Sequence, residues 1–260
     1  MDGKIKRGQI ALWVVLAIIL AASILLYAIV AKSKRLIDER VSIDSPESYI
    51  EECARQEAVK NADMMLKQGG FLNPGNFKEF KKIKIEYLCD QTSSYKPCVQ
   101  QHPGLISDIE SQLYEKINKR ADECFTAFKR EVEKNGGKAE IGSQEVKVSL
   151  GTGKIFVDIG RKISIIKGNS RAEYEKFNYD FIHPIFDLST VAMEIANQEA
   201  VYCHFDPLGY TVYENQFKIR KELFSDYTII YTINDKKTNK TMSIAIRSCA
   251  IPPGTILPEG

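Results

Sequence analysis

The sequence predicts an α+β protein with one N-terminal transmembrane helix, followed by an extracytoplasmic domain with helices packed on an antiparallel sheet. Three observations lead to this prediction. An uncharged, apolar stretch occupies residues 10–31. Residues 50–66 and 105–132 repeat apolar side chains every three or four positions, the spacing of a helix with one buried face. Shorter segments alternate apolar and polar residues, which is typical of strands.

The apolar stretch is long enough to cross a membrane. At about 1.5 Å per residue, residues 10–31 extend about 33 Å, and a bilayer has a hydrocarbon core of about 30 Å. Trp13 and Tyr27 lie near its two ends, where amphipathic rings favour the membrane interface. A cleaved secretory signal is the alternative, but its apolar region normally has about 7–15 residues. We therefore expect a retained transmembrane helix after a short cytoplasmic N-terminus, residues 1–9.

Cysteine usage predicts the side of the membrane on which the domain lies. Basic residues flank the span at 4–7 and at 32–35, so charge does not decide its orientation. All six cysteines follow the span, none forms a CxxC pair, and their number is even. An oxidising exterior accounts for this pattern through disulfide bonds. We expect a single-pass protein of the cell membrane, with a charged stalk at 32–44 and the domain on the extracytoplasmic side.

Three helices are expected in the domain, which spans 45–250. A capping side chain, a proline and an acid at 44–47 predict the start of the first helix, and Gly69-Gly70 predicts its end. The second helix follows Pro103-Gly104 and closes at 135–137. The third occupies 184–202.

Short strands separate and follow these helices. An alternating segment lies before the second helix, a meander with tight turns follows that helix, and a final hairpin precedes a Pro-rich tail. The expected strands are 83–87, 146–150, 154–159, 162–166, 172–182, 227–233 and 241–247, and the tail is 251–260. Helices grouped around an antiparallel sheet give the α+β class.

Composition and motifs exclude several function classes. The net charge is +2, so no electrostatic footprint for nucleic acid is present. The Gly151-Thr152-Gly153-Lys154 segment is shorter than a phosphate loop and indicates a hairpin turn. His204 and Asp206 would supply two metal ligands without a third, which is too few for a metal site. Cys203 is expected to form a disulfide and not to act as a nucleophile. We expect no catalytic residue, cofactor or metal.

The residues before the apolar stretch carry a resemblance to a known family. Lys6-Arg7-Gly8-Gln9-Ile10 resembles the processing signal of archaeal type IV pilin-like proteins. The resemblance implies cleavage between Gly8 and Gln9, with the helix kept for anchoring or assembly. The chain differs from many pilins at Trp13, where they carry glutamate.

A second resemblance covers more of the chain. The block Tyr49–Cys53, with Ala58, Leu66 and the segment Gln68-Gly69-Gly70-Phe71, is similar to uncharacterised archaeal single-pass membrane proteins. Those proteins share an anchor with a KxGQ-type start and two cysteine-bearing helices. Cys124 stands where their second helical cysteine would be, so the resemblance implies a bond between the two helices.

Six cysteines allow 15 pairings, and we predict one of them. Cys89 and Cys98 bracket a short polar loop and are expected to pair. Cys53 and Cys124 lie on the apolar faces of the first two helices, so they become neighbours if those helices pack together. Cys203 and Cys249 remain as the third pair. The alternative is that some are buried free thiols, because Cys is among the most buried residue types.

No activity follows from these features. The preferred hypothesis is a membrane-anchored, non-enzymatic cell-surface or envelope protein that acts through protein–protein contacts. A pilin-like component and a homo-oligomer formed through the N-terminal helix are two forms of this hypothesis. The alternatives are an extracytoplasmic small-ligand or glycan-binding module and a hydrolase with a dispersed active site. Asn239-Lys240-Thr241 is an N-glycosylation sequon in an expected turn, which makes Asn239 a glycosylation candidate.

Overall fold

The structure, a computed structural model, describes residues 16–24, 45–91, 96–247 and 249. It forms two compact units, Met1–Tyr49 and Ile50–Gly260, which are described separately. In the first unit, residues 16–24 are helical and exposed. No helix within the described parts of the chain is both long and apolar enough to cross a membrane.

Several expected features lie outside the described residues. These are the N-terminus 1–9 with Gly8 and Gln9, the stalk 32–44, the tail 251–260 and most of the expected span 10–31.

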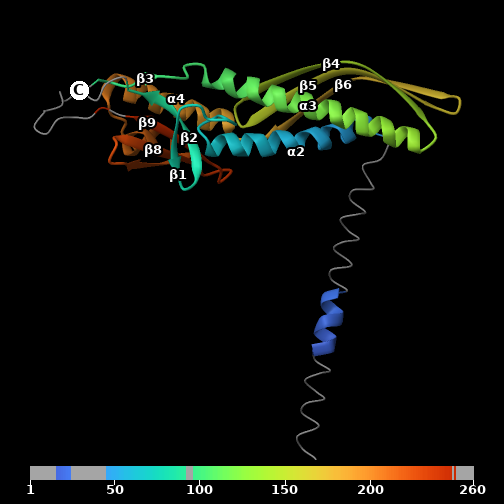
Figure 1. Cartoon of the computed structure of the whole chain (residues 1–260), viewed down its shortest axis with the longest axis horizontal. Coiled ribbons are helices and arrows are strands. Elements are labelled where there is room, and N and C mark those ends of the chain that lie inside the picture. Colours follow the sequence, from blue (N-terminus) through green and yellow to red (C-terminus); the bar gives the residue numbers. More distant parts are fainter. Residues whose placement is uncertain (1–15, 25–44, 92–95, 248, 250–260) are drawn as a thin grey trace, which may run out of the picture. The chain divides into compact units, whose positions relative to one another are not determined.

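The second unit confirms a mixed α+β fold, with two sheets and the helices placed around them (Figure 1). The helices are α2 (Pro46–Lys67), α3 (Leu105–Lys134), α4 (Ile185–Tyr202) and α5 (Pro207–Tyr213). The strands are β1 (Phe77–Phe80), β2 (Ile83–Asp90), β3 (Val99–Gln100), β4 (Lys138–Gly151), β5 (Lys154–Lys167), β6 (Ser170–Ile182), β7 (Phe217–Leu223), β8 (Thr228–Asp235) and β9 (Thr241–Arg247).

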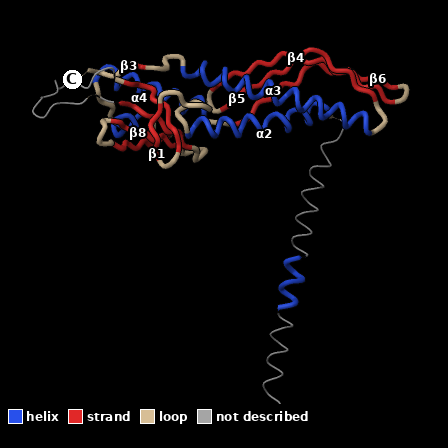
Figure 2. The backbone as a smooth tube through the Cα atoms, in the orientation of Figure 1, coloured by secondary structure: helices blue, strands red, loops and turns tan. Residues whose placement is uncertain are grey.

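Strands β4, β5 and β6 form an antiparallel meander, as predicted. The two segments expected at 154–159 and 162–166 are one long strand, β5, with a shift in register after Gly160. Helix α3 lies along this sheet (Figure 2), and its buried face supplies Phe125, whose ring centroid is 4.8 Å from that of Phe177 on β6. The first hydrophobic core lies between α3 and the meander.

The second sheet corrects the prediction of one antiparallel sheet. Its strand order is β1-β2-β9-β8-β7, with β3 also paired to β2, and β2 pairs with β9 in parallel. Strands β1, β3 and β7 and helix α5 were not predicted. Two of these elements are short, since β3 has two residues and α5 has seven. Helix α4 covers one face, where Tyr231, Met242 and Ile244 are fully buried. This face holds the second core.

The end of α2 depends on two glycines. Gly69 and Gly70 have φ angles of 76° and 96°, a region that favours residues without a Cβ. The Gly70 N–H donates to the Met65 carbonyl at 2.8 Å, which ends the helix where the sequence predicts. A Cβ on Gly70 would lie 2.8 Å from Cδ1 of Leu105, so this residue also allows the chain to pass close to the start of α3.

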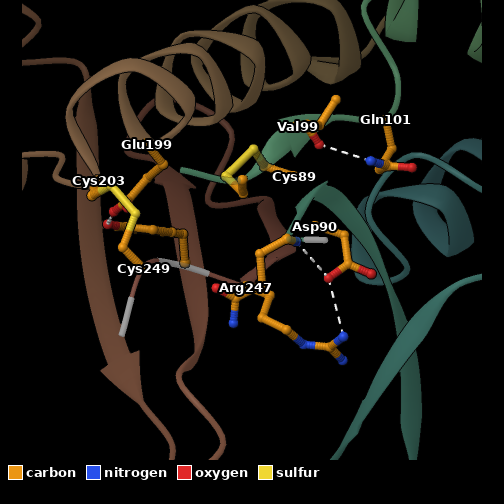
Figure 3. The surroundings of a disulfide bond; sticks show 11 residues. Cys89, Asp90, Val99, Gln101, Glu199, Cys203, Arg247 and Cys249 are labelled. Atoms are coloured by element: carbon orange, nitrogen blue, oxygen red, sulfur yellow. Dashed lines mark hydrogen bonds and ion pairs between the residues drawn. A yellow bond between two sulfur atoms is a disulfide. The ribbon is translucent and has the colours of Figure 1, made fainter. Parts of the chain in front are cut away.

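The six cysteines pair as predicted. Cys53–Cys124 joins α2 to α3 with a Cα–Cα distance of 6.0 Å. Cys89–Cys98 closes a short loop, and its Cα atoms are 5.4 Å apart. Cys203–Cys249 joins the end of α4 to the residues after β9, with 5.6 Å between Cα atoms. Figure 3 shows the last bond near Arg247, whose guanidinium pairs with Asp90 on β2 at 3.1 Å. The first disulfide therefore links the two long helices, and the third links the end of α4 to the segment after the last strand of the second sheet.

Candidate functional site

A cleft of about 460 Å³ opens between the C-terminal end of α2 and the second sheet. It lies on the sheet face opposite α4, because its residues Thr232 and Ser243 alternate along their strands with Tyr231 and Met242, which face α4. Its lining residues are Asp63, Leu66, Lys67, Phe80, Lys81, Ile83, Ile85, Thr232, Asn239, Lys240, Thr241 and Ser243. Its size falls within the range of about 300–1,000 Å³ that is usual for ligand pockets.

Asp63 on α2 is the hydrogen-bonding centre of the cleft wall. Its Oδ1 accepts from the Nζ of Lys240, in the β8–β9 turn, and from the Nε2 of His183 at 3.0 Å. Burial alone would raise the pKa of Asp63, but the hydrogen bonds from Lys240 and His183 outweigh it and hold this pKa below its usual value. Asp63 is therefore a carboxylate whose charge Lys240 compensates, and it ties together three separate segments.

His183 supports this wall from inside the protein. It is 1 % exposed, and its Nδ1 has no hydrogen-bond partner among the described residues. Because Nε2 donates to Asp63, the neutral ring leaves only a lone pair on Nδ1. Protonation would bury an unpaired N–H together with a charge, and burial accordingly lowers the pKa of His183 despite the nearby Asp63. His183 is a structural support of the cleft.

The protein is expected to lose stability as the pH falls below 6.5, the ordinary pKa of histidine. The pKa of His183 is lowered in the folded state, so the unfolded chain binds a proton that the folded chain resists, and the free energy of unfolding falls with pH. Urea unfolding between about pH 7 and pH 5 measures this slope. Replacement of His183 with Gln keeps a donor for Asp63 without a titrating ring and should flatten the slope. An unchanged slope would assign the effect to other groups.

A strained turn places one of the cleft lysines. Phe80 and Ile83 pair across a two-residue hairpin whose central residues, Lys81 and Lys82, have φ angles of 51° and 67°. Such turns favour Asn-Gly, because residues with a Cβ lose about 1–2 kcal/mol in this region. The Lys81 Nζ lies 4.5 Å from the centroid of the Phe80 ring, at the cleft. Backbone strain of this kind often accompanies function.

Substitution of Lys82 by Gly is expected to raise the free energy of unfolding by about 0.5–1 kcal/mol. The strain at φ 67° disappears, and part of this gain is offset by the larger entropy of a glycine in the unfolded chain. Chemical denaturation of the full chain measures the change. Lys84→Gly, in the following strand β2, is the control and should destabilise. A loss of stability in Lys82→Gly would show that the turn is not strained.

The candidate residues from the sequence lie in different places. Asn239 is exposed at the rim of the cleft with φ 56°, so a glycan there would stand beside the opening, and its glycosylation stays a prediction. Gly151–Lys154 is a hairpin turn between β4 and β5, as predicted. Asp206 caps α5 by accepting from the Leu208 N–H at 2.9 Å, and His204 is exposed. No group of three potential metal ligands occurs among the described residues.

Apart from Asn239, the residues that line the cleft were not singled out from the sequence. Asp63 and Lys240 are 177 positions apart, and each stands in a segment that reads as an ordinary polar surface. The one local signal was the Lys81-Lys82 pair between two short alternating segments, where a turn is required but no Gly or Asn is present.

A second surface feature lies at the end of α4 and on α5. Five large apolar side chains there are between 65 % and 88 % exposed: Val201, Tyr202, Leu208, Val212 and Tyr213. Helix α5 buries none of its residues. Exposed apolar side chains that gather in one region often mark contacts with partners.

No protein-family model matches this sequence, and no match is found among the curated proteins or among the solved structures. Function is therefore inferred from the geometry of the cleft and of the α4–α5 surface.

Proposed function

We propose that this chain is a membrane-anchored, non-enzymatic protein of the cell surface or envelope, whose extracytoplasmic domain binds a small ligand in the cleft between α2 and the second sheet. The cleft itself carries this proposal. It combines an apolar lining, Leu66 and Ile85, with hydroxyls and lysines that point to one space. A concave site with a few converging polar groups is the usual form of a ligand pocket.

Two observations support the anchor and its orientation. The described part of the expected span is a helix whose large apolar side chains are exposed, among them Leu16, Ile18 and Ile24. Such side chains are stabilised by lipid or by other apolar helices. Three disulfides agree with an oxidising compartment outside the cytoplasm.

The ligand-binding proposal is tested by a thermal-shift screen of the full chain against small acids, phosphates, sugars and alcohols. We expect at least one class to raise the unfolding temperature, because a ligand that binds only the folded state stabilises it. Ser243→Trp, which fills the cleft from its floor, should lose this shift. A shift that persists in Ser243→Trp would place the ligand elsewhere, and no shift with any class would overturn the proposal.

Topology is tested separately with an epitope inserted at Gly168, in the β5–β6 turn, where φ is 60° and no atom lies within 4 Å of an added Cβ. Antibody should reach the epitope on intact cells. Binding that requires opened cells would put the domain in the cytoplasm.

A second candidate function is contact with a partner protein through the α4–α5 surface, and the exposed side chains there favour it. Asp206 and Glu214 flank α5 and are exposed, which suits a protein with an apolar centre and a basic rim better than an anionic bilayer. Five apolar side chains are far fewer than the roughly 20–30 residues on each side of a stable interface, so the contact would be weak or transient.

Photo-crosslinking in native membranes tests the second candidate. A photoreactive amino acid at Leu208 should capture an envelope protein, with Lys147 on β4 as the exposed control position. Capture of a second copy from Leu208 would make the surface a self-contact, and equal capture from both positions would remove the proposal. A homo-oligomer formed through the N-terminal helix would instead be captured from Ile19.

A further inference from the structure

The cleft has more positive charge than its own carboxylate can compensate. Three lysines line it, Lys67, Lys81 and Lys240, against the single carboxylate of Asp63. Lys240 pairs with Asp63, so the positive charge that remains uncompensated is that of Lys67 and Lys81. Neither of these two has a salt-bridge partner in the described part of the chain, and both are exposed at the cleft mouth. Two uncompensated ammonium groups at a concave surface attract an anion.

The rest of the lining is suited to an apolar group. Leu66 and Ile85 are each 2 % exposed, so they form the closed part of the lining. Phe80 and Ile83, on either side of the strained turn, remain half-buried or exposed next to them. Exposed area on these side chains is removed from water when an apolar chain covers it, with a gain that grows with the area.

Hydroxyl groups stand at the boundary between the charged and the apolar parts. Thr232, Thr241 and Ser243 come from two neighbouring strands, and Thr232 and Ser243 lie directly opposite each other. The Thr241 Oγ1 accepts from the Asn234 Nδ2 at 3.1 Å, which leaves its O–H to donate. Donors of this kind orient an oxyanion that the lysines attract.

We propose that the cleft binds an amphipathic anion, a carboxylate or phosphate group carried on an apolar chain. Lys67 and Lys81 hold the charged group, and Leu66, Phe80, Ile83 and Ile85 cover the chain. This inference rests on the proposed function of the cleft and names its ligand class. A neutral sugar would leave both ammonium groups unused, and it would find one aromatic ring, Phe80, among the lining residues.

The test is calorimetric titration of the full chain in amphipol, with titrations of amphipol alone subtracted. The probes are octanoate, octyl phosphate, 1-octanol and maltotriose. We expect octanoate or octyl phosphate to bind at least about tenfold more tightly than 1-octanol, because charge-assisted hydrogen bonds are lost in the alcohol. A preference between the two anions identifies the natural head group as carboxylate or phosphate.

Variants assign the binding to the two lysines. The double variant Lys67→Gln, Lys81→Gln should weaken the binding of the anion by about tenfold or more and leave the binding of 1-octanol unchanged. Lys116→Gln with Lys119→Gln removes the same charge from exposed positions on α3, outside the cleft, and should have no effect. Circular dichroism and thermal unfolding establish that each variant is folded, and Lys67 and Lys81 are exposed, so both are expected to fold normally.

The outcomes distinguish failure of this inference from failure of the proposed ligand-binding function of the cleft. If 1-octanol binds as tightly as octanoate, or if the lysine variant binds anions normally, the ligand class is wrong. If maltotriose binds and is blocked by Ser243→Trp while both anions fail, the cleft is a ligand site for a neutral sugar and only this inference falls. If Ser243→Trp changes the binding of no probe, both proposals fall.

Discussion

Replacement of Cys53 and Cys124 together by Ala is expected to lower the free energy of unfolding by about 4 kcal/mol. The bond closes a chain segment with a sequence separation of 71 and joins α2 to α3. In the chain-entropy model, loss of such a cross-link gives the unfolded chain this much additional freedom. Because α2 carries Asp63 and Lys67, a looser α2 should also weaken ligand binding in the cleft.

Urea denaturation of the full chain measures this effect, and the slope of the transition should increase as the unfolded chain expands. The Cys89/Cys98 pair, with a separation of 9, is the matched control, and its removal should cost about 2.5 kcal/mol. Equal losses from the two double variants, or a larger loss from the shorter loop, would contradict the entropic account.

Phe128→Ala is expected to lower the free energy of unfolding by about 3–5 kcal/mol. Phe128 lies on the buried face of α3 and is 0 % exposed, so truncation removes apolar contacts and leaves a cavity beside this helix. Ile50, Leu113 and Ile117 are also fully buried, and their replacement by Ala should cost about 2–5 kcal/mol each.

Tyr114→Ala on the same helix is the control, because this side chain is 41 % exposed. Denaturant midpoints of the two variants give the comparison, with the slope checked for two-state behaviour. A change below about 0.5 kcal/mol in Phe128→Ala, the size usual for surface positions, would contradict the assignment of this helix face to the core.

Local patterns were sufficient for the elements with strong periodicity. The buried residues of α3, from Leu105 to Val132, follow the spacing that predicted the helix, and Asn135 ends it as expected. The meander β4-β5-β6 was also predictable, since tight turns join strands that are adjacent in the sequence. The disulfides followed from the helix faces, the short loop at Cys89 and Cys98, and the resemblance to archaeal proteins.

Local patterns could not predict which strands pair when they are far apart in the sequence. Strands β2 and β9 lie side by side in parallel although most of the chain separates them, and no property of Tyr87 or Ala245 alone predicts that they are partners. The cleft has the same origin, because Asp63 and Lys240 meet only through the packing of α2 against the second sheet. Strand β7, with four exposed residues after Ile219, lacks a regular alternation of burial.

Native mass spectrometry of the full chain, released from the membranes in which it was made, tests the central claim most directly. We expect the wild-type protein to carry a small bound molecule whose accurate mass fits a compound with a carboxylate or phosphate group. We expect Ser243→Trp to lack this molecule. A bound molecule that persists in folded Ser243→Trp would contradict the assignment of the cleft as its site, and wild-type protein that carries none and accepts no added octanoate or octyl phosphate would contradict an amphipathic anion as the ligand.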